Sequence, residues 1–213
     1  MNIFKRTKYP VVYSEEEINL IEKHIDKHFG KFDNVIHEVV SPDIHIDICI
    51  IEPTKEQNYY TLVTVGMGAY DMNVPKECKN LDFSNAELLI TLPSNWDIKS
   101  NDEKWYWPIR LLKTFARFPL EQKTWLGYGH TVSNVEQYAE NTEFNNTLIS
   151  LPYYFGEEAL NCSLSNKKVN FYQLIPLYES ELNYKLENGV EELENKFPEN
   201  FNMIVDIKRK KVV

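Results

Sequence analysis

The chain has little that would place it in or across a membrane. Its 213 residues contain no stretch that approaches the roughly 18 consecutive apolar residues of a membrane-spanning helix. The charged residues at positions 5 and 6 are followed by no apolar region of the kind that a secretory signal needs. We therefore expect no membrane partner and a cytoplasmic location.

Cysteine is also scarce. Cys49, Cys78 and Cys162 are an odd number of thiols, they form no C-x-x-C pair, and no histidine stands near them at zinc-finger spacing. Disulfides are typical of oxidising compartments, so this pattern favours a reducing compartment and free thiols. It agrees with the cytoplasmic location.

Positive charge is the scarcer sign. The chain has 23 Lys and Arg against 32 Asp and Glu, a formal net charge of −9, although residues 208–211 (KRKK) form a basic run near the C-terminus. An acidic protein is poorly suited to bind nucleic-acid phosphates, and it attracts cationic proteins over distances of about a Debye length. We expect no nucleic-acid partner and favour a basic protein partner.

Motifs of common enzyme classes are missing. Residues 66–69 (GMGA) lack the third glycine of a dinucleotide loop and the Lys-Ser/Thr of a P-loop, and no G-x-S-x-G elbow occurs. His24 and His28 share a helical face, but Ile25 follows His24 where a zincin has its glutamate base. The sequence therefore predicts no enzyme, no bound metal and no cofactor.

The hydrophobic pattern predicts a helix followed by a β-hairpin. Ser14 and Glu17 form a capping box, isoleucines then recur at helical spacing, and Gly30 ends the segment. Residues 43–50 alternate isoleucine with other residues, as in a strand with one apolar face, and residues 59–65 read as its hairpin partner.

The remaining elements favour an α+β fold. We expect a helix over 109–118, with Pro108 in its first turn and Pro119 at its end, and acidic helices over 179–197 broken at Gly189. Strands without regular βαβ alternation predict a mixed, mainly antiparallel sheet with flanking helices. The length favours a single domain over residues 1–213. Further strands are predicted at 86–92, 147–151, 169–177 and 203–207.

Two groups of residues are candidates for partner binding. Asp43, His45 and Asp47 alternate along the predicted strand on the face opposite its isoleucines. Such a face could meet a partner group or one metal ion, but a catalytic zinc needs three protein ligands. The alternative is a polar strand face that is exposed or bonded to its neighbours.

The second group is Tyr128 and His130, which lie among glycines directly after the predicted helix. Glycine lets the backbone approach a partner closely and exposes ring faces, so this turn is typical of recognition. The alternative is a helix cap whose aromatic residues fold into the core. Likewise, the acidic residues of 179–194 present carboxylates either to a basic partner or to solvent.

Five blocks of sequence in one order support a family resemblance. They are residues 46–53 (IDICIIEP), 59–67 (YYTLVTVGM), 107–113 (WPIRLLK), 124–132 (TWLGYGHTV) and 169–178 (VNFYQLIPLY). In order and content these blocks resemble the suppressor-of-fused domain, over about residues 35 to 190.

The resemblance implies a mixed α+β domain with a non-catalytic protein-binding role. Longer animal relatives hold a transcription factor of the Hedgehog pathway by adding its peptide as a strand between two domains. This chain matches only the first of those domains, so the clamp does not carry over. Short bacterial members are associated with polymorphic toxin systems, where they act as immunity proteins that neutralise a toxin, often a nuclease.

Three hypotheses follow from the residues and the resemblance together. The leading one is an immunity protein, or antitoxin, that binds a cognate toxin made by the same cell. The second is a general peptide-binding regulatory module that pairs an extended segment with a sheet edge. The third, with the least support, is an enzyme that uses a metal held by His45, Asp47 and His130. The partner, the interface and the oligomeric state stay open.

Overall fold

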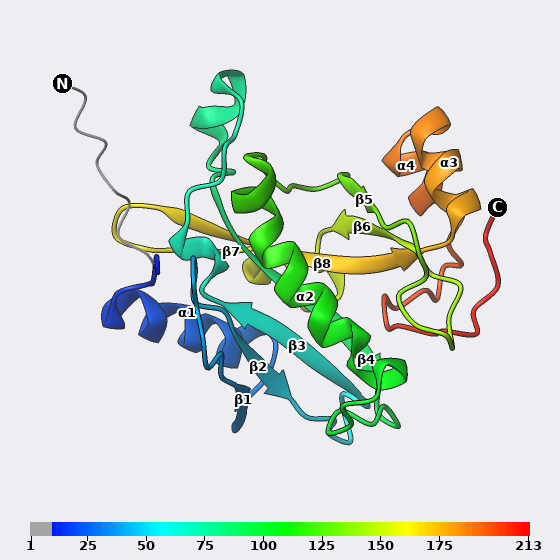
Figure 1. Ribbon diagram of the computed structural model, residues 1–213, viewed down its shortest axis with the longest axis horizontal. Helices are drawn as coiled ribbons and strands as arrows, with labels where there is room; N and C mark the ends of the chain where they lie inside the picture. The colour runs from blue at the N-terminus through cyan, green and yellow to red at the C-terminus, as the bar shows by residue number, and fades with distance from the viewer. Residues whose placement is uncertain (1–9) are drawn as a thin grey trace.

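One eight-stranded sheet organises the chain, with helices on both of its faces (Figure 1). The computed structural model describes residues 10–213. The strand order is β1-β2-β3-β4-β8-β6-β5, with β7 paired to β8 off this path. All pairings are antiparallel except β4 with β8, so the predicted mixed, mainly antiparallel α+β fold is confirmed. The strands are β1 (Asn34–Ile36), β2 (Asp47–Ile51), β3 (Tyr59–Val65), β4 (Asn85–Pro93), β5 (Thr131–Ser133), β6 (Asn146–Ser150), β7 (Asn161–Ser163) and β8 (Lys168–Leu177), and the helices are α1 (Glu15–His28), α2 (Glu103–Gln122), α3 (Glu179–Asn188) and α4 (Val190–Glu194).

Helix α1 covers one face of the sheet and begins where the sequence predicts. Ser14 and Glu17 form the expected capping box, which satisfies two backbone N–H groups at the start of the helix. Ile21 and Ile25 are fully buried against the sheet, where Phe171 of β8 belongs to the same cluster. The apolar stripe at helical spacing therefore produces the predicted contact.

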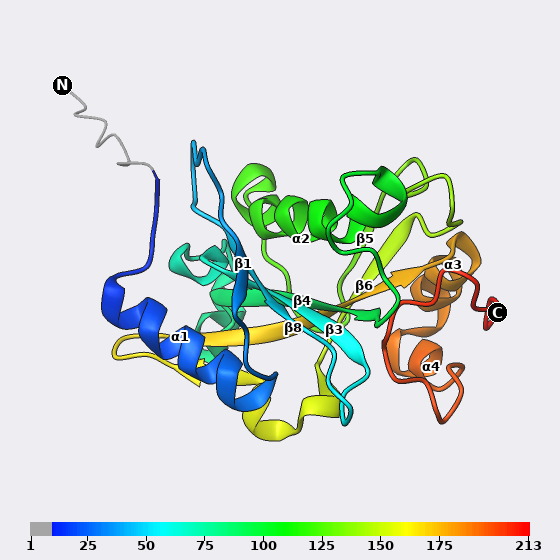
Figure 2. The ribbon, with the colours of Figure 1, turned by 90° about the horizontal axis from the view of Figure 1, so that it is seen from below.

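The alternation along β2 separates two cores. Ile46 and Ile48 pack on the α2 side of the sheet, whereas Cys49 and Ile51 pack on the α1 side. Figure 2 shows the sheet between these two helices. The antiparallel pairing with β3 is confirmed, but the strand begins at Asp47 rather than at residue 43. The residues just before Asp47 do not belong to the strand. They make one isolated bridge, between Ile44 and Val11.

Helix α2 is longer than its prolines predict. Pro108 and Pro119 both lie inside it, so the expectation that they begin and end the helix was wrong. A proline cannot donate to the carbonyl four residues earlier, which for Pro108 is the carbonyl of Lys104. Asn141 Nδ2 donates to that carbonyl instead, at 3.0 Å. A contact distant in sequence thus replaces the lost helical hydrogen bond.

The C-terminal part forms a third, smaller cluster. Helices α3 and α4 break at Gly189 as predicted, and Leu193 packs on β6 and β8. The strand predicted at 203–207 is wrong, because Ile204 makes only an isolated bridge, with Thr91 of β4. Strand β8 pairs with β4 only as far as Leu89. Beyond Leu89, β8 no longer pairs with that side of β4, and Thr91 makes its bridge with Ile204 there.

The basic run near the C-terminus is partly folded into this cluster. Both guanidinium NH₂ groups of Arg209 bond to the carboxylate of Glu181, which is fully buried. The guanidinium carbon also lies 4.8 Å from the ring centroid of Tyr178. Arg209 is therefore a structural residue, unlike the exposed Lys210 that follows it.

The three thiols are free, and Cys49 and Cys162 are buried. Within residues 10–213, no helix has the length and apolar content to cross a membrane. The N-terminal residues 5 and 6, considered above for a signal sequence, lie outside the described part of the chain.

Candidate functional site

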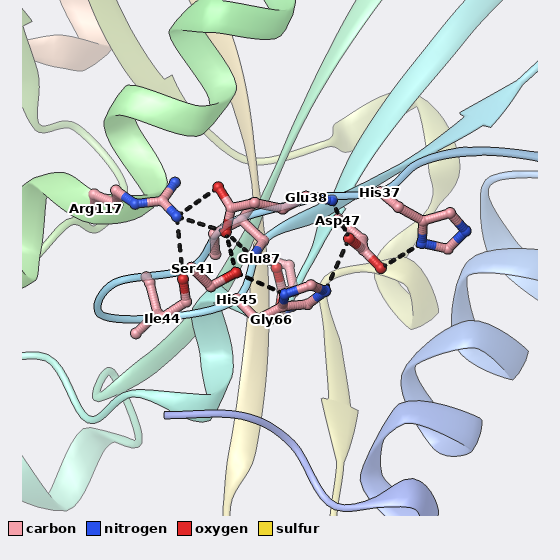
Figure 3. A network of polar contacts seen from close by, with 10 residues as sticks. His37, Glu38, Ser41, Ile44, His45, Asp47, Gly66, Glu87 and Arg117 are labelled. Carbon is pink, nitrogen blue, oxygen red and sulfur yellow. Dashed lines mark hydrogen bonds and ion pairs between the residues drawn. The ribbon is translucent and has the colours of Figure 1, made fainter. Parts of the chain in front are cut away.

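The first candidate group lies in a hydrogen-bonded network in the segment that connects β1 and β2 (Figure 3). The His45 ring bridges the Ser41 hydroxyl, at 2.7 Å from Nδ1, and Asp47 Oδ1, at 3.0 Å from Nε2. The second oxygen of Asp47 lies 2.9 Å from Nδ1 of His37. The backbone N–H of Glu38 also donates to Asp47. Asp47 thus serves as an acceptor for three groups of the same segment.

Arg117 of α2 fixes the other side of this segment (Figure 3). Its guanidinium lies 2.6 and 2.7 Å from the two oxygens of Glu38 and 3.1 Å from Asp43 Oδ1. It also donates to the carbonyl of Ile44, at 3.1 Å. Charge-assisted bonds of this kind are among the stronger hydrogen bonds in proteins. The helix therefore clamps the segment through side chains and backbone together.

The order Ser41–His45–Asp47 resembles a hydrolase relay, but its hydrogen bonding is that of a structural network. The Ser41 hydroxyl donates to Glu38 Oε2 at 2.7 Å, so its proton points away from the imidazole. With that bond formed, the Ser41 hydroxyl has no proton left to donate to the imidazole, and only its lone pairs face the ring. A hydroxyl activated as a nucleophile would instead give its proton to the ring.

The network explains the role of the polar residues that the sequence places on one strand face, Asp43, His45 and Asp47. Asp43 and Asp47 keep only 23% and 19% of their side-chain surface exposed and are held inside the network, whereas His37 is 73% exposed. A small cavity of about 80 Å³ opens beside His45 and Asp47, lined mostly by apolar residues. In the described part of the chain, no three His, Cys, Asp or Glu side chains are grouped so that they could hold a metal ion.

Glu87 of β4 holds the end of β3 and the turn that follows it. The sequence did not identify this residue as part of the site. Its buried carboxylate accepts hydrogen bonds from Tyr13, Thr64 and the backbone N–H groups of Gly66 and Gly68, at 2.6 to 3.0 Å. Burial raises the pKa of this carboxyl, and the four donors oppose the rise. A single glutamate inside the apolar run of β4 was the available signal.

The second candidate group forms a different site, at the turn between α2 and β5. The Tyr128 hydroxyl donates to Glu194 Oε2 at 2.8 Å, and Glu194 also accepts from Ser150. Burial and the Glu194 carboxylate together raise the pKa of Tyr128. Gly129 has φ +79° and packs against α4. Tyr128 is 36% exposed, so its ring is available at the surface although its hydroxyl is held by α4.

His130 lies at the start of β5, beside a hollow in the surface. Its ring meets that of Trp125 edge to face, with 4.3 Å between centroids. Burial lowers the pKa of His130, a hydrogen bond to the Trp125 carbonyl opposes this, and the charge of Lys185 lowers it further. The hollow has a volume of about 320 Å³ and is lined by Trp125, His130, Thr131, Val132 and Lys185, among others.

Strand β5 is an edge of the sheet. It pairs with β6, and no strand within residues 10–213 pairs with its other side. Ile149 N–H donates to the carbonyl of His130, and Asn134 N–H donates to that of Asn145, which fixes the register of the ladder. Because bonded positions alternate along an antiparallel strand, the N–H and C=O groups of Thr131 and Ser133 point away from β6.

The five candidate residues therefore form two sites and not one. Asp43, His45 and Asp47 lie at or near β2, whereas Tyr128 and His130 lie beside β5. Strands β3, β4, β8 and β6 separate these places in the sheet. At about 4.8 Å a step, the five steps from β2 to β5 span about 24 Å. A partner segment at one site does not reach the other without a large interface.

Comparison with known sequences points to one family. A family model described as Suppressor of fused protein (SUFU) matches residues 42–210. An uncharacterized protein of Ureaplasma parvum is 29% identical over 205 residues, covering 94% of this chain and 98% of that protein.

Solved structures show the same fold. A putative SUFU homolog from Neisseria gonorrhoeae has a TM-score of 0.68 at 22% identity, covering 92% of this chain and 96% of that one. Suppressor of Fused from Drosophila has a TM-score of 0.69 at 14% identity, and the match covers 51% of its chain. A chain of the Sufu-Fu complex has a TM-score of 0.67 at 12% identity. Because the family model spans most of the sequence, this chain belongs to the suppressor of fused family.

Proposed function

We propose that the chain is a non-catalytic protein-binding domain that takes up an extended segment of its partner at the open edge of β5. The observation that carries this proposal is the edge itself. Thr131 and Ser133 direct outward backbone groups with which no strand of the described residues pairs, next to the half-exposed rings of Tyr128 and His130. An added strand gains affinity from main-chain bonds and specificity from side-chain pockets, and both are available here.

The family supports a binding role. One of the structural neighbours is the Sufu-Fu complex, so the fold occurs in a protein that forms a complex. The other edge strands within residues 10–213, β1 and β7, are also three residues long. The segment after β1 is bonded to Asp47 and Arg117, and β7 packs against α1 through Cys162. Strand β5 is therefore the better candidate.

For the partner, we propose a cognate bacterial toxin, which makes the chain an immunity protein. The resemblance to short bacterial members and the net charge of −9 support this assignment. Exposed acidic residues lie on α1 and at α3 and α4, where they would attract a basic toxin such as a nuclease. They include Glu15, Glu16, Asp26, Glu187, Glu191 and Glu192. Association should be fast and should slow as the salt concentration rises. A general regulatory module that binds peptides by the same edge is the alternative.

Co-expression with toxins encoded beside the gene tests both parts of this proposal. We expect one such toxin to lose its toxicity and to co-purify with the chain. Ser133→Pro removes an outward N–H group and should weaken that complex more than tenfold, about 1.4 kcal/mol. Ser133→Ala keeps the N–H group and is the matched control, with wild-type affinity expected.

The outcomes separate the two parts. Failure to rescue growth or to co-purify with any neighbouring toxin refutes the immunity role. A toxin that binds Ser133→Pro as tightly as it binds Ser133→Ala refutes the β5 edge as the binding site. The melting temperatures of the two variants should agree, because Ser133 is exposed and its N–H group bonds to no strand in the part of the chain that the structure describes.

A further inference from the structure

The hollow beside β5 holds a positive charge that the protein itself does not neutralise. Lys185 of α3 lines the hollow together with His130 and Trp125. Its ammonium group has no ion pair within residues 10–213, although the protein is strongly acidic overall. Burial also lowers the pKa of Lys185, so water solvates this ammonium less well than it solvates an exposed one.

Of the carboxylates close to Lys185 in sequence, Glu187 is exposed and, two residues away, does not share a face of the helix with it, whereas three others are engaged elsewhere. Glu179 accepts hydrogen bonds from Asn145 and Asn146, and Glu181 is buried against Arg209. Glu194 of the adjacent helix serves Tyr128 and Ser150. Each of these acids is held by partners of its own, which leaves Lys185 available to a group from outside.

His130 adds a second group that favours an anion. Its ring donates to the backbone carbonyl of Trp125, so the other ring nitrogen can take a proton and become a second donor. Burial and the Lys185 charge lower the pKa of His130, and a carboxylate placed between the two side chains would oppose this lowering by stabilising the protonated imidazole. The Trp125 ring, edge to face with His130, limits how far that imidazole can turn away.

We propose that the segment added to β5 places an aspartate or glutamate side chain in this hollow, against Lys185 and His130. Thr131 and Val132 line the hollow and also belong to the edge strand, so a strand paired there passes directly over it. This inference rests on the proposed strand addition and specifies one residue of the added segment. A partner that is basic overall can still carry this acidic residue. Its net charge governs the rate of encounter, whereas one acidic side chain makes the local contact with Lys185 and His130.

A random twelve-residue peptide library displayed on phage tests the anchor without knowledge of the natural partner. The library is selected on the wild-type protein, Lys185→Met, Lys196→Met and Ser133→Pro. Lys196→Met removes the same charge from an exposed site close to α4 and serves as the control. We expect the wild type and Lys196→Met to enrich peptides with an acidic residue at one fixed position, and Lys185→Met to lose that preference.

An enriched peptide then gives a direct measurement. Exchange of its acidic residue for the matching amide should weaken binding to the wild type by about tenfold or more and should change binding to Lys185→Met less than twofold. Peptides that need the Ser133 N–H group but show no acidic preference would overturn the anchor and leave strand addition standing. No enrichment on the wild type beyond that on Ser133→Pro would overturn strand addition, and the anchor with it.

Discussion

Gly66 lies where two parts of the chain approach most closely. Its φ of +124° is one that L side chains rarely adopt, and a Cβ built on it would stand 1.9 Å from the carbonyl oxygen of His45. Its N–H group donates to the buried carboxylate of Glu87. One glycine therefore allows the β1–β2 connection to pack against the end of β3.

Gly66→Ala should destabilise the protein by more than about 3 kcal/mol, because it adds both backbone strain and a clash with main-chain atoms. Gly156→Ala is the matched control. Gly156 also has positive φ, +83°, but no atom lies within 4 Å of its Cβ position, so a loss of about 1 kcal/mol is expected. Urea unfolding of both variants measures the difference. Equal losses would show that strain alone, and not the contact with His45, explains the need for glycine.

At the scale of elements, the sequence predicts best where a periodic pattern is long. Helix α1 and the β2–β3 hairpin follow from isoleucine spacing, and β8 from a run of apolar and aromatic residues. Three-residue strands such as β5 are too short to show any period. Helix α2 begins at the Asp102 cap and ends at Lys123, which has a left-handed conformation, and Asn141, distant in sequence, bonds the carbonyl that Pro108 leaves free. Local proline rules therefore could not place its ends.

The C-terminal segment is held to α3 by Arg209, which the sequence reasoning took for part of a basic run. Arg209→Met leaves the buried Glu181 carboxylate without its cation and should cost about 3 to 5 kcal/mol. Lys210→Met makes the same charge change at an exposed neighbour and should stay within about 0.5 kcal/mol of wild type. Thermal unfolding of the two variants compares them. Similar melting temperatures would mean that the Glu181–Arg209 pair contributes little to stability.

At the scale of the whole molecule, the sequence predicts the fold and the family but not how the candidate sites relate. Tyr128 and His130 lie at the β5 edge, whereas Asp43 and Asp47 are held in a network that fixes a connection near β2. The strand order determines how far the two candidate sites lie from each other. That order depends on pairing between segments that are distant in sequence, which no local pattern encodes. That residues 1–213 form a single domain stays a prediction.

Stability should depend on pH through three partly buried histidines. Burial lowers the pKa of His24, His28 and His130, so in mildly acidic solution the unfolded chain binds more protons than the folded chain. The free energy of unfolding should therefore fall as the pH drops below about 6.5, the ordinary value for histidine, by at most about 1.4 kcal/mol per pH unit for each group. Glu87 acts in the opposite sense, because its raised pKa favours the folded state when the carboxyl is protonated.

His24→Gln tests this dependence at one group. His24 stacks on Phe171, with 4.7 Å between ring centroids, and bonds to the carbonyl of Ala159, so its charged form is poorly accommodated. Urea unfolding at several pH values between about 7.5 and about 5 should show a smaller loss of stability for this variant than for wild type. If His24→Gln loses stability with falling pH as steeply as wild type does, protonation of His24 is not a source of the slope, and His28 and His130 are the next groups to test.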